Sequence, residues 1–373
     1  MNRKVVAGVY IERDGVTVMC ASHDDFLLPK INTDHVIPRM GPELRVEALD
    51  ERKWHPKDSD SAIAAVQETV EDIVDAYPDI QSIAVAGFGT FVSLMRSNKE
   101  FYGKVHEKFG HDPFKGINLH NLVRERLLTS NASCSAKVSV HTDAHAYTLG
   151  EAINRSNEKN HLLVGILCTE GIGGGIVRGN STFQSALHPE FGLITPRIHH
   201  GDDILKKAGA ADDPYWAFSR SFGEVASTEA MRQRFAEDAN VCYENVSNDD
   251  LLKLHERHWE FRSYYLAQLC FICTSLLAPH GIVVASDLDP NGTLLDEVVG
   301  HFDRIAETRE LDGQPMLDYE QYRKNPRFVS GLSMYRHDKL KSRKPSIPIT
   351  GALGACLLAA RVSRGGHAKS NTT

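Results

Sequence analysis

The stretch at residues 161–179, HLLVGILCTEGIGGGIVRG, constrains the fold more than any other part of the chain. Its apolar run, residues 162–168, is typical of a strand buried on both faces. A glycine cluster follows, and a second short apolar run comes directly after it. This order predicts strand, glycine turn and strand, an arrangement that can bring backbone N–H groups close to a phosphate. Glu170 places an anion in the same turn.

The composition is that of an ordinary globular protein and excludes several function classes. A length of 373 residues allows two domains, and the net charge of −7 argues against a general nucleic-acid binder. We expect no signal peptide, because the N-terminal stretch lacks the charged start, apolar run and small-residue cleavage site of one. We also expect no membrane segment, because the longest apolar run, residues 266–279, is too short to span a bilayer. Seven cysteines, an odd number, are interpreted as scattered without a close C-x-x-C pair, so neither a disulfide framework nor a thiolate zinc site is expected. A cytoplasmic location is therefore expected.

Alternating strand and helix patterns predict an α/β fold. An Asp-Gly turn at residues 12–15 indicates a hairpin, and residues 32–58 are interpreted as an irregular excursion. Asp60 or Ser61 is expected to cap a helix, and residues 255–277, apolar on two sides, predict a buried central helix. The other predicted strands are residues 83–86, 137–140 and 282–285, and the other predicted helices are residues 119–128, 224–236, 294–305 and 351–361.

Two lobes are expected. Residues 1–140 form the first and residues 141–346 the second, the latter with a charged insertion at 308–346. The basic run at 336–344 within that insertion is interpreted as a solvated surface rather than a binding patch. A terminal helix at 347–362 is expected to pack back on the first lobe, with a disordered tail after it.

Five stretches, taken together and in order, resemble the ROK group of sugar kinases, repressors and open reading frames, with the bacterial fructokinases as the nearest branch. They are residues 142–151 (TDAHAYTLGE), 170–175 (EGIGGG), 188–192 (HPEFG), 259–268 (WEFRSYYLAQ) and 351–355 (GALGA). The resemblance implies an actin-like (ribonuclease H-like), two-lobed fold that binds ATP with Mg²⁺ and a hexose. It also implies a homodimer. A repressor role is discounted, because the first strand begins too near Met1 for a helix-turn-helix domain.

The resemblance assigns roles to particular residues. Asp143 falls on the catalytic base, which accepts the proton of the attacking sugar hydroxyl. The sugar-binding residues implied are Thr142, His145, His188, Glu190 and Glu224, and the nucleotide-binding residues are Glu170, Gly171, Gly173, Gly174 and Gly175. The residue pattern alone leaves open that Asp143 is a helix N-cap, that the glycines form a ligand-free hairpin turn, and that His188 and Glu190 lie in an ordinary surface loop.

Several positions depart from the family pattern. Glu12 and Asp14 stand where the first phosphate loop carries Thr and Lys, and Glu170 replaces a small hydroxyl residue in the second. A carboxylate 4 Å from a phosphate charge costs about 4 kcal/mol at an effective dielectric near 20, which Arg13 or a bound metal ion could offset. Ser286 and Asp287 replace the glycine pair expected near adenosine.

The structural zinc site of many relatives is not expected here, because its histidine position is Leu193 and no cysteine lies between His200 and Glu224. The register there also puts Gly223 at the sugar-binding carboxylate position, with Glu224 one residue later.

A different metal site is a minor alternative. His141, Asp143 and His145 alternate, so they would share one face if the strand continued through all three. His188, His199 and His200 could then complete a site for a divalent ion.

Two functions therefore remain open. One is an ATP-dependent hexose kinase with Asp143 as its base. The other is a pseudokinase that keeps the fold but acts as a sugar-binding or assembly protein, because both phosphate loops and the adenosine glycines are altered.

Overall fold

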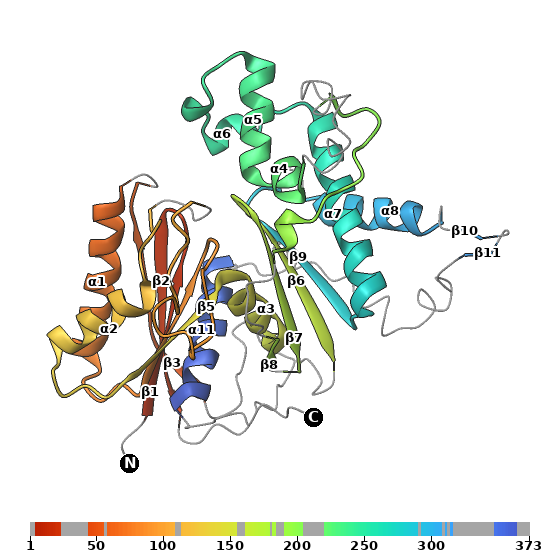
Figure 1. Ribbon diagram of the computed structural model, residues 1–373. Coiled ribbons are helices and arrows are strands. Elements are labelled where there is room, and N and C mark those ends of the chain that lie inside the picture. The colour runs from red at the N-terminus through yellow and green to blue at the C-terminus, as the bar shows by residue number, and fades with distance from the viewer. Residues whose placement is uncertain are drawn as a thin grey trace. The chain divides into compact units, whose positions relative to one another are not determined.

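The computed structural model (Figure 1) contains two compact units, and one of the points where the chain passes between them, from Gly174 to Gly175, falls within a strand. The first unit comprises residues 1–160, 175–189 and 337–373, and the second comprises residues 161–174 and 190–336. The residues whose placement is described are 4–23, 44–55, 58–108, 113–154, 161–179, 181–183, 190–203, 220–289, 292–307, 310–311, 314–315 and 347–363. The basic run at 336–344 lies outside them. The predicted tail, residues 363–373, also lies outside them except for Ser363, which is the last residue of the terminal helix.

The first unit is built on a five-stranded sheet with the order β3-β2-β1-β4-β5. Its strands are β1 (Lys4–Ile11), β2 (Gly15–His23), β3 (Leu44–Lys53), β4 (Ser82–Gly87) and β5 (Lys137–Thr142). β1 and β2 form the predicted hairpin, closed where the Glu12 N–H donates to the carbonyl of Gly15 at 2.8 Å. β4 and β5 run parallel to β1, so the carboxyl ends of these three strands lie at one edge of the sheet.

The interpretation of residues 32–58 as irregular is wrong for its second half. β3 spans Leu44–Lys53 and pairs antiparallel with β2 along its whole length. Its highly charged sequence is suited to the edge of a sheet, where one side of the strand faces water. β3 is stabilised by backbone pairing with β2, and this pairing cannot be predicted from the spacing of apolar side chains in β3.

The two faces of this sheet are covered by different helices (Figure 1). Ala7, Val9 and Ile11 of β1 join a core that includes the buried side chains of α1 (Ser59–Ala76) and α2 (Leu119–Ser130). Gly8 and Tyr10 alternate with them and meet α11 (Ile347–Ser363), where a Cβ on Gly8 would lie 2.4 Å from the carbonyl oxygen of Ala352. α11 also packs against α3 (Asp143–Asn154), which belongs to the first compact unit. This unit therefore extends beyond residue 140, where the sequence placed the end of the first lobe.

The capping residue of α1 is Asp58, and the prediction of Asp60 or Ser61 is wrong. The Asp58 carboxylate accepts the backbone N–H of Ser61 at 2.9 Å, the usual geometry for a cap three residues before its donor. Asp60 instead lies in the first turn, where a negative charge complements the helix dipole.

The second unit contains the parallel strands β6 (Leu162–Cys168) and β9 (Gly281–Ser286), paired in register from Leu163 with Gly281 to Cys168 with Ser286. They belong to a sheet ordered β8-β7-β6-β9, in which β7 is Ile172–Arg178 and β8 is Ser181–Thr182. Short two-residue strands β10 (Glu310–Leu311) and β11 (Gln314–Pro315) pair with each other within the predicted insertion.

The helices of the second unit are α4 (Phe222–Ala226), α5 (Thr228–Ala239), α6 (Asn248–Leu251), α7 (Glu256–Leu277) and α8 (Leu294–Glu307), with single 3₁₀ turns η1 (Phe191–Leu193) and η4 (Tyr243–Asn245). The predicted helix at 224–236 is broken at Ser227, whose hydroxyl caps α5 by accepting the N–H of Ala230 at 3.1 Å. α7 is buried along most of its length as predicted, but Leu276 near its end is 77% exposed. Within the described ranges, none of the helices has the length and apolar character needed to cross a bilayer.

Candidate functional site

The junction between β5 and α3 brings three predicted residues together in the first unit. Thr142 is the last residue of β5, and its hydroxyl accepts the backbone N–H of His145 at 3.1 Å. That is N-cap geometry, so Thr142 provides the cap that the residue pattern had left open for Asp143. Asp143 is the first residue of the helix, and its carboxylate accepts the N–H of Ala144 at 2.7 Å.

The pKa of Asp143 is shifted into the neutral range. The side chain is half-buried, and this burial, together with the nearby charge of Glu12, raises the pKa of Asp143 to about 7. A carboxylate in this range can accept a proton at neutral pH far better than one with the ordinary pKa near 4. Tyr10 lies in the same cluster, where burial and then the charges of Asp143 and Glu12 raise its own pKa.

The histidines beside Asp143 are neutral and do not form the alternating metal site. β5 ends at Thr142, so the strand alternation stops before Asp143 and His145. Burial lowers the pKa of His141 to about 3 and that of His145 to about 4. His145 pairs its Nδ1 with the Thr142 hydroxyl at 2.9 Å, and across the described residues no group of three His, Cys, Asp or Glu side chains is arranged to hold a metal ion.

The glycine turn is shorter than predicted. β7 begins at Ile172, so the turn consists of residues 169–171, and Gly173, Gly174 and Gly175 lie within the strand. A Cβ on Gly174 would meet the ring of Phe191 at 2.2 Å, and one on Gly175 would meet the Ala144 carbonyl oxygen at 2.4 Å. These two glycines are therefore required by close packing. Gly171 differs, because a Cβ there would meet nothing within 4 Å.

Glu170 forms an ion pair with Arg232 of α5. The guanidinium binds both carboxylate oxygens, with Nη2 at 2.6 Å from Oε1 and Nη1 in contact with Oε2. The side chains are only 13% and 23% exposed, for Arg232 and Glu170 respectively. Arg232 thus supplies the compensating charge that the sequence suggested for Arg13 or a metal ion. The two partners are 62 residues apart, which explains why no local motif revealed the pair.

A second arginine ties together the segments around this turn. Arg262 is fully buried and donates to the carbonyls of Ala226 at 3.0 Å and Leu288 at 2.8 Å. Its Nη2 lies 3.8 Å from Asp287, whose carboxylate also accepts the Thr228 hydroxyl at 2.7 Å. Asp287 follows β9 and Glu170 follows β6, so both carboxylates stand at the carboxyl ends of adjacent parallel strands, where α/β sheets bind ligands.

The two carboxylates assigned to sugar binding in the second unit have different surroundings. Glu190 directly precedes η1, and its carbonyl accepts the N–H of Leu193 at 3.1 Å. Glu224 completes a capping box at the start of α4, where its Oε2 accepts the backbone N–H of Ser221 at 2.8 Å. A local structural role thus accounts for the position of Glu224. His188 lies outside the described residues.

A buried ion pair holds the segment around residue 200 to the helices. Arg234 of α5 donates to both oxygens of Asp202, at 2.9 and 2.8 Å, and the Tyr265 hydroxyl donates to the same carboxylate at 2.6 Å. The Tyr265 oxygen also accepts the N–H of His199 at 3.3 Å. The side chains of Asp202 and Arg234 are 1% and 7% exposed, so the network is isolated from water.

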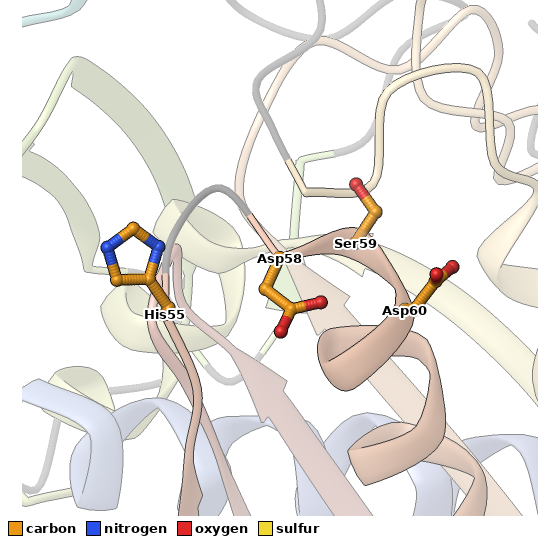
Figure 2. Close-up of a pocket in the computed structure, with 4 residues that line it drawn as sticks. All are labelled: His55, Asp58, Ser59 and Asp60. Atoms are coloured by element: carbon orange, nitrogen blue, oxygen red, sulfur yellow. The ribbon is translucent and has the colours of Figure 1, made fainter.

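Two other features lie apart from these residues. Cys270 and Cys273 on α7 have a C-x-x-C spacing, so the expectation of cysteines without a close pair is wrong. Both are free and buried, and burial raises the pKa of Cys273 to about 12, which makes the thiols unreactive. An open pocket of about 490 Å³ lies at the start of α1 (Figure 2). It is lined by His55, Asp58, Ser59 and Asp60, none of which is a predicted site residue.

Comparison with known proteins agrees with this arrangement of elements. The chain is 26% identical over 226 residues to a fructokinase of Lactococcus lactis subsp. cremoris, covering 60% of this chain and 68% of that protein. Among solved structures it is similar to the ROK hexokinase of Thermus thermophilus, with a TM-score of 0.60, 14% identity and coverage of 97% and 100% of the two chains. A ROK glucokinase of Streptomyces griseus, in complex with glucose and AMPPNP, gives a TM-score of 0.58 at 14% identity and the same coverage.

These structural likenesses confirm the predicted actin-like α/β fold. The sequence model of the ROK family matches residues 43–317, which include the β5–α3 junction, the turn with Glu170 and the helices that carry Arg232 and Arg262. The chain belongs to the ROK family.

Proposed function

We propose that the chain is an ATP-dependent sugar kinase of fructokinase type, in which Asp143 is the general base. The observation that carries the proposal is the state of Asp143. Its pKa is raised to about 7 by burial and by Glu12, and Thr142 has taken over the capping of α3. The fructokinase relative and the ROK family support a sugar as the substrate class. A homodimer and a cytoplasmic location stay predictions.

The reaction requires little covalent chemistry from the protein. A sugar hydroxyl oxygen forms a bond to the γ-phosphorus of ATP, the bond from that phosphorus to the bridging oxygen of ADP breaks, and the hydroxyl proton passes to the Asp143 carboxylate. Mg²⁺ bound with the nucleotide neutralises phosphate charge and commonly keeps several waters, so it does not require a preformed protein cluster. We assign it no protein ligand.

The turn at residues 169–171 fits the nucleotide phosphates in two respects. Gly171 has open space where a side chain would stand, so packing against the protein does not require a glycine there. The charge of Glu170 is compensated by Arg232, which weakens the sequence argument for a pseudokinase. In the first unit, the neutral His145 beside Thr142 is suited to hydrogen bonding with a sugar hydroxyl rather than to charge pairing.

The test is ADP release over a panel of hexoses and amino sugars at millimolar ATP and Mg²⁺. We expect sugar-stimulated turnover that falls as the pH is lowered through about 7, because protonated Asp143 cannot act as a base. Asp143→Asn should reduce turnover by about 10²- to 10⁴-fold, the usual contribution of a general base. If no sugar stimulates turnover and ATP does not raise the melting temperature, the pseudokinase is the correct function.

A further inference from the structure

Glu170 and Arg232 form a pair that neither the family resemblance nor the local sequence assigns. The pair lies at the carboxyl end of β6, in the turn that the proposed function gives to the nucleotide phosphates. We propose that Arg232 is a positioning residue for ATP, which holds and neutralises Glu170 so that this turn can receive phosphate. The inference rests on the proposed kinase function.

The charges around the turn show why one arginine matters. The charge of Glu170 acts on Asp287, whose pKa is raised by burial and, to a smaller extent, by that charge. Glu229 also approaches, 3.4 Å from Arg232. The cations of this cluster are Arg232 and Arg262, and the Arg262 side chain is largely occupied by the carbonyls of Ala226 and Leu288.

The pair has the geometry of a fixed arrangement. Both oxygens of Glu170 are bound, and Arg232 is also held by Asn248, whose Oδ1 accepts from the same Nη2 at 2.8 Å. A planar guanidinium suits this fork-like contact better than a lysine ammonium, which is a point charge. Because both side chains are mostly buried, salt screens the pair less than an exposed one. Glu170 is therefore kept in one orientation with its charge compensated.

Replacing one partner at a time measures the effect of each charge on ATP binding separately. In Arg232→Gln the Glu170 charge is left beside the phosphates, so we expect the Kd for ATP with Mg²⁺ to rise at least tenfold. In Glu170→Gln the arginine loses the carboxylate that binds it through both oxygens and keeps the longer contact with Glu229, so its charge is less compensated and the Kd should fall. The double variant has a neutral turn, and its Kd should return to within about threefold of the wild-type value, while Arg232→Lys should recover only part of the loss.

Arg257→Gln is the matched control, because it removes the same charge from an exposed pair with Asp238 elsewhere in this unit. Binding is measured by calorimetry at low and high salt, and melting temperatures without nucleotide confirm that each variant is folded. An Arg232→Gln protein that is folded and binds ATP as tightly as Arg257→Gln would overturn the inference. A double variant as weak as Arg232→Gln would also overturn it, since Arg232 would then act on phosphate directly.

The same experiment distinguishes the failure of the kinase proposal. If wild type and every variant fail to bind ATP, the nucleotide site is absent and the proposed function fails with it. If wild type binds and turns over sugar while Arg232→Gln is unchanged, the kinase remains and only the role of Arg232 is wrong.

Discussion

Replacing Asp143 by asparagine is expected to make the protein more stable at pH 8 while it lowers the proposed kinase turnover. Folding raises the pKa of this carboxyl from its usual 3.8 to about 7, chiefly by burial. A group with a raised pKa in the folded state contributes stability below its unfolded pKa and loses it as pH rises through the folded pKa. At 1.36 kcal/mol per pKa unit, the ionised carboxylate therefore costs about 4 kcal/mol at pH 8.

The asparagine side chain carries no charge, so the variant avoids this cost and can still accept the Ala144 N–H. Its advantage in free energy of unfolding should grow from about 2 kcal/mol at pH 5 to about 4 kcal/mol at pH 8, as upper estimates. Urea unfolding at 25 °C across this range measures it.

Asp58→Asn supplies a control with the opposite sign. The backbone N–H of Ser61 lowers the pKa of Asp58, so its stabilising effect is present at high pH and is lost as pH falls. Asp58→Asn should therefore be less stable than wild type at pH 8, with a smaller difference in acid. If Asp143→Asn also proves less stable at pH 8, or shows the same change at every pH, then Asp143 is not a destabilised carboxylate and the argument for its basicity fails.

Two further predictions concern the second unit. Gly174→Ala should lower the free energy of unfolding by about 1–3 kcal/mol, because its Cβ would overlap the ring of Phe191. Gly171→Ala should change the free energy of unfolding little, because its Cβ meets open space. Urea unfolding of the two variants tests this contrast, and equal losses would contradict it. Asp202→Asn should cost about 3–5 kcal/mol, because it leaves the Arg234 charge buried without its ionic partner. Thermal and urea unfolding measure this loss, and a change under 1 kcal/mol would refute it.

Features determined by nearby residues could be predicted from the sequence. The β1–β2 hairpin follows from its Asp-Gly turn, and the strand before Asp143 follows from its apolar run, whereas the strand-to-helix junction at Asp143 was implied by the family resemblance. The capping residue of α3 could not be chosen from the sequence, because Thr142 and Asp143 are both polar residues suited to a cap. The position of the Thr142 hydroxyl beside the N–H of His145 decided between them.

Features determined by distant partners could not be predicted. β3 is stabilised by its pairing with β2, which its charged side chains do not reveal. The sequence places Gly174 in the predicted turn, yet it is needed because the ring of Phe191, which lies outside this strand-turn-strand segment, packs against it. The surroundings of Glu170 depend on Arg232, and an arginine on a helix gives no sign of which carboxylate it will pair with.

The acidic residues at the positions that we propose for the two phosphate loops are compensated in both units, though not equally. In the first unit Lys53 of β3 lies 3.4 Å from Glu12 and 3.6 Å from Asp14, but its side chain is 58% exposed, so salt and water weaken these pairs. In the second unit Arg232 is mostly buried and binds both oxygens of Glu170. A carboxylate that departs from the family pattern in a phosphate loop is therefore not by itself a sign of lost activity. What matters is whether a cation from elsewhere in the fold neutralises it, and for Glu170 that cation is fixed within the same unit.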